Sequence, residues 1–595
     1  MGNAQSQNDA NADKDGIAAT AYGSGSEIES VDENSVASAT ESDKNEKEPD
    51  YTSLDIVSKL DGEMLMEQHR NYAPPSSSVA PSVHYVFLVH GWLGNDLEMS
   101  YLSEAFHKNI LSEEEVSDDN GQNGSGLPAT KRVKRSRSPT TGALQNELQD
   151  GSNEELTHPD IVVHSAKCNV GKTHDGIRNG GTRLANEIIN FIQCDTKKRQ
   201  EEGGANGDDD YNVTISLVGN SLGGLYSRFA LSKIPYEIPL SYDESNENES
   251  SSKLKIRLFP NIFCTTATPH LGISQHTYLP IPRLAETIIG TGMGTTGRDL
   301  FRLNSDAMND GAAAKVNAAA AMTVKRLGTS FRILQGSNHD IEVEDDDEDD
   351  AECVIRNMCV DNEYLVPLGN FRRRIAYANA YGTDFQVPCQ TAAFLNDNSG
   401  VGHYIIGARS LKDNSELGEN LKGGAENKRS NDEEGDSEEK PIPPFVVAIL
   451  RTEKQSQAQT PVRKLSRVAE ASDDLLQMSQ SLDALGWTKV FVDMRDSIPV
   501  PGLRKPSWMC QNSLDDLIKQ RSAINDTGDK LTNRMLTSQD LSRSTATADS
   551  FNVPLGHTVM VANSKSEAYK QINFQGRPVM DKLAHDIVDD VFAFE

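Results

Sequence analysis

Hydrophobic residues in this chain gather in short runs separated by long polar stretches. Apolar side chains dominate residues 83–89 (VHYVFLV), 213–218, 374–379 and 487–494. Runs of this length, rich in β-branched and aromatic residues, predict strands that are buried on both faces of a sheet. Residues 221–231 (SLGGLYSRFAL) directly follow the second run and have the pattern of an amphipathic helix. We therefore expect an α/β fold, with a mostly parallel sheet and helices on both faces.

The intervening stretches are rich in Ser, Asn, Gly and acidic residues. Such segments cannot bury enough apolar surface to offset the entropy lost on ordering. We predict disorder in an acidic N-terminal tail and in long insertions of the folded part: 1–50, and about 112–157, 199–210, 241–253, 340–352, 410–441 and 512–549. Subtracting these from the 595 residues leaves a single domain between residues 81 and 595.

The segment GNSLGG at 219–224 lies between a predicted strand and a predicted helix. Gly219 and Gly223 flank Ser221 in a G-x-S-x-G pattern, in which a tight strand-to-helix turn holds the serine side chain clear of the sheet edge. A side chain at either glycine would collide with the neighbouring strand and helix. The pattern also occurs in ordinary Gly/Ser turns, but strand, motif and helix in this order are much rarer. We predict that Ser221 is a nucleophile.

A nucleophilic serine needs backbone N–H groups that bind the oxyanion. His90 and Gly91 begin the segment HGWLG at the end of the first predicted strand. A glycine-containing loop in this place can turn one N–H toward the serine, and the residue after the serine supplies another. We predict donors at Leu222 and at either Trp92 or Leu93. The alternative is a glycine turn with a packed tryptophan.

Three motifs occur together: HG at 90–91, GNSLGG at 219–224 and TATPHLG at 266–272. In this combination the chain resembles the eukaryotic serine esterases, a lipase-like family of the α/β-hydrolase superfamily that includes the Rog-type yeast lipases. The similarity runs in patches from about residue 83 to the C-terminus. The resemblance implies an α/β-hydrolase fold, chemistry that needs no metal or organic cofactor, and an ester with a fatty acyl chain as substrate.

The acid that orients the histidine is expected in a loop after a late strand. Asp384 follows the predicted strand 374–379 and is similar to the family's Asn…Asp-x-x-Val-Pro pattern. Asp340 is the rival, but it precedes an acidic run that is better explained as a solvated loop. We therefore favour Asp384.

The histidine is expected after the last strand, because the chain order in this fold is serine, acid, histidine. We expect 487–494 to be that strand, and only His557 and His585 follow it. His557 lies in a predicted loop with glycine and proline before an apolar run, whereas His585 lies in a helical pattern. His270, in PHLG, precedes the acid and is expected to be structural. We predict that His557 is the base.

Charge and cysteine content exclude some classes of protein. The formal net charge of -31, from 58 basic and 89 acidic residues, argues against general nucleic-acid binding. The seven cysteines are scattered without metal-site or disulfide spacing, which agrees with a reducing cytosol. The basic segment 131–137 (KRVKRSR) is open between a nuclear import signal, a lipid-headgroup contact and a solvated run of charge.

The N-terminus matches the acceptor pattern for N-myristoylation, M-G-x-x-x-[ST], with Gly2 as the modified residue. A single acyl chain binds membranes with a partition constant of only about 10⁴ M⁻¹. The acidic tail would also be repelled by anionic lipid. The first thirty residues lack the apolar core of a signal peptide, and no run of about 18 apolar residues occurs. We therefore predict a cytoplasmic protein with reversible membrane contact at most.

The predicted function is hydrolysis of carboxylic esters through an acyl-enzyme. The same residues would serve a thioesterase or an acyltransferase. An alternative of another class is a signalling adaptor that uses the hydrolase fold only as a scaffold. Residues 278–303, apolar and glycine-containing, are open between a cap over the site and an ordinary helix pair.

Overall fold

The computed structural model describes residues 55–74, 81, 83–115, 160–203, 211–240, 254–274, 283–303, 353–384, 386–408, 445–455, 471–495, 514–523, 535–545 and 556–592. All of them belong to one compact unit, Asp50–Glu595. The predictions of disorder for 1–50, 241–253, 340–352 and 410–441 fall outside the described residues, as do those for 116–157 and 204–210.

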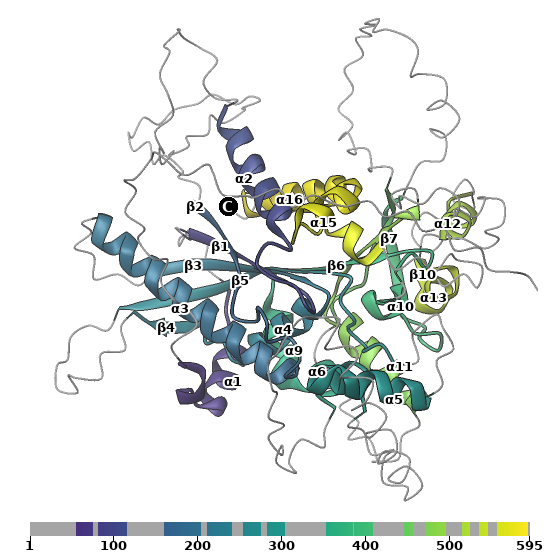
Figure 1. Ribbon diagram of the computed structural model, residues 1–595, viewed down its shortest axis with the longest axis horizontal. Helices are drawn as coiled ribbons and strands as arrows, with labels where there is room; N and C mark the ends of the chain where they lie inside the picture. The colour runs from purple at the N-terminus through teal and green to yellow at the C-terminus, as the bar shows by residue number, and fades with distance from the viewer. Residues whose placement is uncertain are drawn as a thin grey trace, which may run out of the picture. The chain divides into compact units, whose positions relative to one another are not determined.

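Ten strands of the described residues form one sheet in the order β10-β7-β8-β9-β6-β5-β3-β1-β2, with β4 paired to β5 (Figure 1). Neighbouring strands from β2 to β9 in this order are parallel. Strands β8, β7 and β10 extend the sheet in antiparallel fashion, and β4 is antiparallel to β5. The prediction of a mostly parallel α/β sheet is confirmed. The strands are β1 (Val83–Val89), β2 (Asp160–Ser165), β3 (Tyr211–Asn220), β4 (Glu237–Pro239), β5 (Lys255–Thr266), β6 (Arg373–Asn379), β7 (Gly402–Ala408), β8 (Val446–Arg451), β9 (Thr488–Val492) and β10 (Met535–Thr537).

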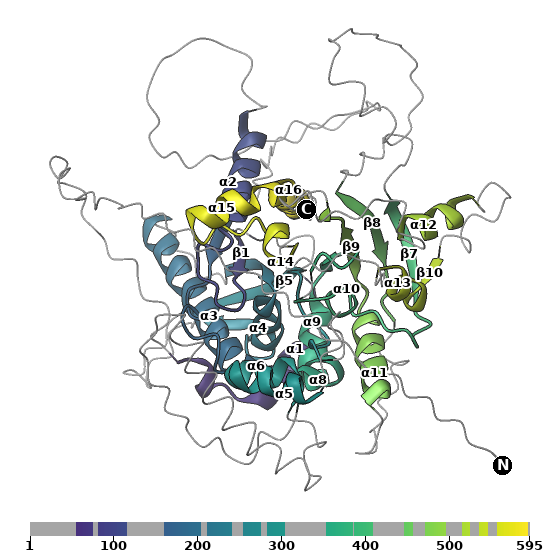
Figure 2. The same ribbon diagram turned by 45° about the vertical axis from the view of Figure 1, so that its right-hand side comes forward.

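Helices cover both faces of the sheet (Figures 1 and 2). Helices α3, α4, α8 and α9 lie on one face, and α2 and α16 lie on the other. The helices are η1 (Val57–Lys59), α1 (Gly62–Arg70), α2 (Ser100–Glu115), α3 (Ile177–Gly203), α4 (Leu222–Leu231), α5 (Arg283–Gly292), α6 (Gly294–Leu300), α8 (Val354–Val360), α9 (Asn362–Asn370), α10 (Cys389–Ala392), α11 (Ala471–Asp483), α12 (Leu514–Ala523), α13 (Ser538–Thr545), α14 (Gly556–Met560), α15 (Glu567–Asn573), η12 (Phe574–Gly576) and α16 (Arg577–Phe592).

Strand β1 shows how one apolar run supplies two cores. Its odd-numbered residues, from Val83 to Val89, lie in a cluster with α3 and α4. Val86 and Leu88 lie in a second cluster with α2 and α16. All seven residues are buried, and burying a large apolar side chain contributes about 1.5–3 kcal/mol. The run therefore stabilises the middle of the sheet from both sides, as its composition predicts.

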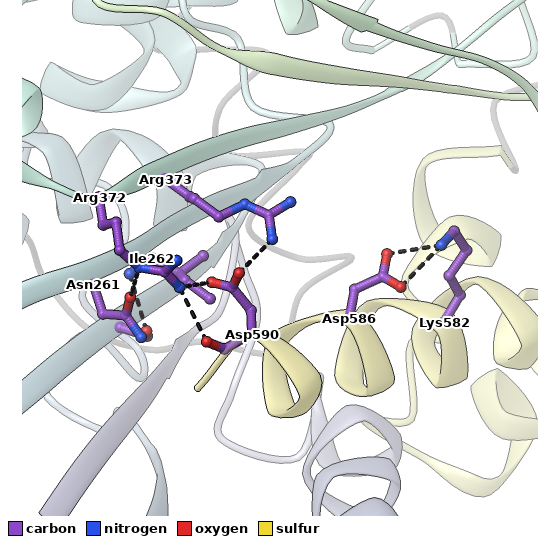
Figure 3. Close-up of polar contacts among 8 residues, drawn as sticks. Asn261, Ile262, Arg372, Arg373, Lys582, Asp586 and Asp590 are labelled. Carbon is purple, nitrogen blue, oxygen red and sulfur yellow. Dashed lines mark hydrogen bonds and ion pairs between the residues drawn. The ribbon is translucent and has the colours of Figure 1, made fainter. Parts of the chain in front are cut away.

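Asp590 ties the C-terminal helix α16 to the start of β6 (Figure 3). Its carboxylate accepts hydrogen bonds from Arg372 and from Arg373, the latter over 2.6 Å, at the start of β6. Arg372 Nε also donates to Asn261 Oδ1 of β5 (2.8 Å). These contacts fix the helix that follows the candidate base along the chain.

The structure differs from the prediction of disorder within 512–549. Helix α12, strand β10 and helix α13 lie in this range, and β10 pairs with β7. Leu514, Leu536 and Leu541 are completely buried there. Composition averaged over the whole insertion hides these leucines, which a sheet edge far along the chain can cover.

Three element boundaries also differ from the prediction. Helices α2 and α3 extend into the ranges 112–157 and 199–210. The folded unit begins before residue 81, because Ile56 and Val57 are buried in the core. Their N–H groups both donate to Asn186 Oδ1, over 2.8 and 2.9 Å. A short apolar pair preceding a polar helix gives no sequence signal for such docking.

Candidate active site

Ser221 occupies the turn between β3 and α4, at the edge where the parallel strands end. Its φ of 52° and ψ of -122° are unusual for a residue with a side chain, and such a conformation costs about 1–3 kcal/mol. The Ser221 N–H donates to Thr266 O (2.8 Å) and holds the backbone in place. A Cβ on Gly223 would lie 2.2 Å from a carbonyl oxygen of β1, and one on Gly219 would lie 2.5 Å from the backbone of α4. The turn therefore requires glycine at both positions.

Two backbone N–H groups near this turn are free to bind a ligand. Leu222 is the first residue of α4, and Trp92 follows the HG pair after β1. Within the described part of the chain, neither N–H has a hydrogen-bond acceptor. The N–H of Leu93, by contrast, donates to Thr173 Oγ1 (3.1 Å). Of the two alternatives for the second oxyanion donor, the geometry favours Trp92.

Gly91 brings the loop that carries Trp92 against the nucleophile turn. A Cβ on Gly91 would lie 3.0 Å from Ser221 Cβ and 3.3 Å from Asn220 O. The absence of a side chain therefore permits the close approach. His90 is buried, and its ring Nδ1 lies 3.0 Å from Gly91 O, so this histidine supports the loop.

Asp384 and His557 are joined by a hydrogen bond of 2.8 Å between His557 Nδ1 and Asp384 Oδ2. Asp384 follows β6 and is buried. Its second oxygen, Oδ1, accepts the N–H groups of Gln386 and Val387 over 3.1 and 2.9 Å. With the Nδ1 proton directed to the carboxylate, the imidazole has Nε2 available as the basic nitrogen.

The segment before His557 is fastened to the loop that carries the acid. Gly556 N–H donates to Thr383 O (3.0 Å). Asn379 Nδ2, at the end of β6, donates to Asp384 Oδ2 (3.2 Å) and to Gly556 O (3.3 Å). Acid and base therefore share one backbone support, although 173 positions of sequence separate them.

The local structure around His557 differs from the prediction. His557 lies in the short helix α14 rather than in a loop, and β10 rather than β9 is the last strand. An apolar run as short as the one that begins here does not distinguish a helix from a strand by periodicity alone. Neither difference alters the chain order of serine, acid and histidine.

The surroundings of His557 favour its protonated form. Burial lowers the pKa of this imidazole. The charge of Asp384, the hydrogen bond to it and the charge of Glu98 together outweigh burial, so that the pKa of His557 lies above its ordinary value.

No hydrogen bond joins Ser221 to His557 in this structure, but a buried carboxylate contacts the residue before Ser221 and acts on His557 through its charge. Glu98 Oε1 accepts Asn220 Nδ2 (2.7 Å), in the residue before Ser221, and the Glu98 charge acts on His557. Hydrogen bonds between nucleophile and base often tighten only when substrate binds. The sequence did not predict a role for Glu98, because a single glutamate between Leu97 and Met99 gives no motif or periodic signal.

The rival residues lie elsewhere. His585 is exposed on α16 with its Nδ1 3.2 Å from Asp589 Oδ1. His270 is completely buried, with Nε2 3.0 Å from Thr265 Oγ1 and Nδ1 3.2 Å from Arg228 Nη1 of α4. The PHLG motif thus supports the nucleophile helix, as expected. The remaining candidates, Asp340, Gly2 and the basic segment 131–137, lie outside the described residues.

Residues 283–303 form the helices α5 and α6, which pack against each other. Helix α6 also holds the start of α3: Thr296 Oγ1 accepts Gly176 N–H (2.9 Å), and Asp299 Oδ2 accepts Ile177 N–H (2.8 Å). These are the contacts of a packed helix pair, the second of the two alternatives for this region.

The described residues show neither a membrane-spanning helix nor a cluster of metal ligands. No helix in those ranges is both long and apolar enough to pass through a bilayer. Across the same ranges, no group of three or more His, Cys, Asp and Glu side chains is arranged to hold a metal ion. The acylation of Gly2 and the membrane contact stay predictions.

Comparison with known proteins gives a family for this site. Residues 142–395, which include Ser221 and Asp384, match the family described as "Putative serine esterase (DUF676)". This part of the chain is therefore similar to that esterase family. The chain is also similar to "Putative lipase ROG1" of Saccharomyces cerevisiae, with 31% identity over 144 residues. The match covers 24% of this chain and 16% of the yeast protein. The resemblance to the Rog-type family is confirmed, and the comparisons support a serine hydrolase in general terms.

Proposed function

We propose that this protein hydrolyses carboxylic esters with a fatty acyl chain, using Ser221, Asp384 and His557. The observation that carries the proposal is the hydrogen bond between Asp384 and His557, at the sheet edge where Ser221 occupies a strained turn. Strained backbone and buried acid–base pairs are characteristic of functional sites.

Each residue has one role in the proposed reaction. Ser221 Oγ attacks the acyl carbonyl while His557 Nε2 takes its proton, and Asp384 stabilises the imidazolium that forms. The N–H groups of Leu222 and Trp92 bind the oxyanion. His557 then protonates the departing alcohol. A water molecule, deprotonated by His557, attacks the acyl-enzyme and releases the carboxylic acid and free Ser221.

A lipid substrate is supported by the apolar side chains beside the proposed oxyanion donors. Leu93 and Leu97, in the loop between β1 and α2, expose 42% and 51% of their surface. Exposed leucines next to a reactive centre suit contact with a fatty acyl chain. The name of the yeast relative, "Putative lipase ROG1", agrees with a lipid substrate.

Fluorophosphonate labelling and hydrolysis of p-nitrophenyl esters test this proposal. Ser221→Ala should abolish labelling and lower kcat by about 10³-fold or more, with an unchanged unfolding temperature. Ser227→Ala is the matched control, because it removes a buried hydroxyl from α4, the helix that directly follows Ser221. If Ser221→Ala keeps more than about a tenth of the wild-type turnover, the proposal is wrong. Comparing palmitoyl with acetyl esters, and esters with thioesters, then defines the substrate.

A further inference from the structure

We propose that Glu98 is a positioning residue of this site: its carboxylate holds the oxyanion loop against the nucleophile turn and places a negative charge beside His557. The inference rests on the proposed roles of Ser221 and His557. It adds a buried anion that acts on nucleophile, oxyanion loop and base together.

The hydrogen bonds of Glu98 converge on two of these elements. Glu98 is buried, with 3% of its surface exposed. Its Oε1 accepts both Gly91 N–H (2.9 Å) and Asn220 Nδ2 (2.7 Å). Gly91 precedes the proposed donor Trp92, and Asn220 precedes Ser221. One oxygen atom therefore sets the distance between the loop that binds the oxyanion and the residue that attacks.

Backbone contacts connect Glu98 to the third element. Ser564 N–H, in the segment that follows α14, donates to Glu98 O (3.1 Å). On the other side, a Cβ on Gly94 would lie 2.2 Å from Glu98 Oε2, so the loop closes tightly around the carboxylate. Gly91 and Gly94, the two glycines of HGWLG, therefore both lie against Glu98, and the loop encloses its carboxylate.

The carboxylate is not neutralised by a basic side chain. No lysine or arginine in the described ranges forms an ion pair with Glu98. The charged groups that act on His557 are Asp384, from the loop after β6, and Glu98, from the loop after β1. His90, which lies next to Gly91, and Asp96 are the other titratable side chains of this loop. As Ser221 attacks, His557 becomes positively charged, and the negative charges of Asp384 and Glu98 both stabilise it.

The test separates charge from shape. Glu98→Gln keeps an oxygen that accepts both hydrogen bonds but removes the charge, whereas Glu98→Ala removes both. Glu104→Gln, which removes an exposed carboxylate from α2, is the matched control. The titration of His557 is followed by NMR of histidine-labelled protein in a Ser221→Ala background, so that the readout does not depend on hydrolysis. His557→Gln identifies the signal among the 13 histidines.

In Glu98→Gln, the pKa of His557 should fall by about half a unit or more, since a favourable charge has been lost. In the Ser221-intact protein, Glu98→Ala should lower kcat by about ten- to a hundredfold with little change in KM, because two buried donors lose their acceptor. Glu104→Gln should change neither. A His557 that titrates in Glu98→Gln as it does in the parent overturns the proposal, whatever the Ser221 variants show about hydrolysis.

Discussion

Two buried histidines of this domain lie beside a carboxylate, and their surroundings drive them in opposite directions. His557 faces Asp384 and Glu98, and its pKa is raised. Nε2 of His403, on β7, lies 3.9 Å from Asp483 Oδ1 and 2.9 Å from Lys489 Nζ. Burial and the Lys489 charge hold the pKa of His403 well below its ordinary value. A nearby carboxylate therefore does not make a histidine basic; the sum of the charges around it does.

His403, Lys489 and Asp483 form a polar cluster that is buried beside the antiparallel strands of the sheet. Lys489 Nζ of β9 lies 2.6 Å from Asp483 Oδ1 at the end of α11, and neither side chain has any exposed surface. Burial raises the pKa of Asp483 to about 6, although Lys489 opposes this shift. Lys489 also lies 3.8 Å from the centre of the Phe394 ring. We expect this cluster to contribute to stability and specificity of folding, and the edge of the parallel strands to contribute the chemistry.

The largest expected effect is a loss of activity, and it should follow from changes to Asp384 or His557 and not from changes to the Lys489–Asp483 pair. His557→Ala and Asp384→Asn should each lower kcat/KM for p-nitrophenyl esters by about 10³-fold or more, because the base or its orienting acid is lost. Calorimetry should find both variants folded. His585→Ala, on the exposed face of α16, is the control and should stay within about twofold, since surface changes rarely matter. If His585→Ala is the inactive variant, His557 is not the base.

A smaller effect should separate them by stability. Lys489→Met leaves Asp483 buried without its partner and should lower the free energy of unfolding by about 3–5 kcal/mol. The folded fraction should keep its turnover. The double variant Lys489→Met, Asp483→Leu should regain most of the loss, because neither charge is then left unpaired. Denaturant titration measures this. A stable but inactive Lys489→Met would mean that the sealed cluster takes part in the reaction.

The smallest effect is the position of the pH profile. His557 acts as a base only when neutral, and its raised pKa extends the protonated form to higher pH. Activity should therefore fall on acidification with an apparent pKa above about 6.5. The kcat/KM profile between pH 5 and 9 tests this. A midpoint well below the ordinary imidazole value would indicate that burial, and not the two carboxylates, dominates at His557.

The parts of the fold that follow from short stretches of sequence, such as apolar runs and amphipathic patterns, could be predicted. Residues 83–89 form β1 as predicted, and the helix after Ser221 begins at Leu222. The pair of Asp384 and His557 followed from chain order within a resembled family. Glu98 and Asn220, in contrast, are 122 positions apart, and no local sequence pattern predicts that they form a hydrogen bond. The same holds for β10, whose three residues gain their partner only in the folded sheet.

At Ser221, the conformation of the backbone and the presence of a side chain make opposite demands on the choice of residue. A residue with a Cβ is held at a φ of 52°, where glycine would rest without strain. Considered by backbone strain alone, glycine would be the more stable residue at this position. The proposed role of the Ser221 hydroxyl is the reason for which a serine would be kept there. Serine at position 221 is therefore what is expected if the proposed reaction matters more to this protein than the stability that glycine would add.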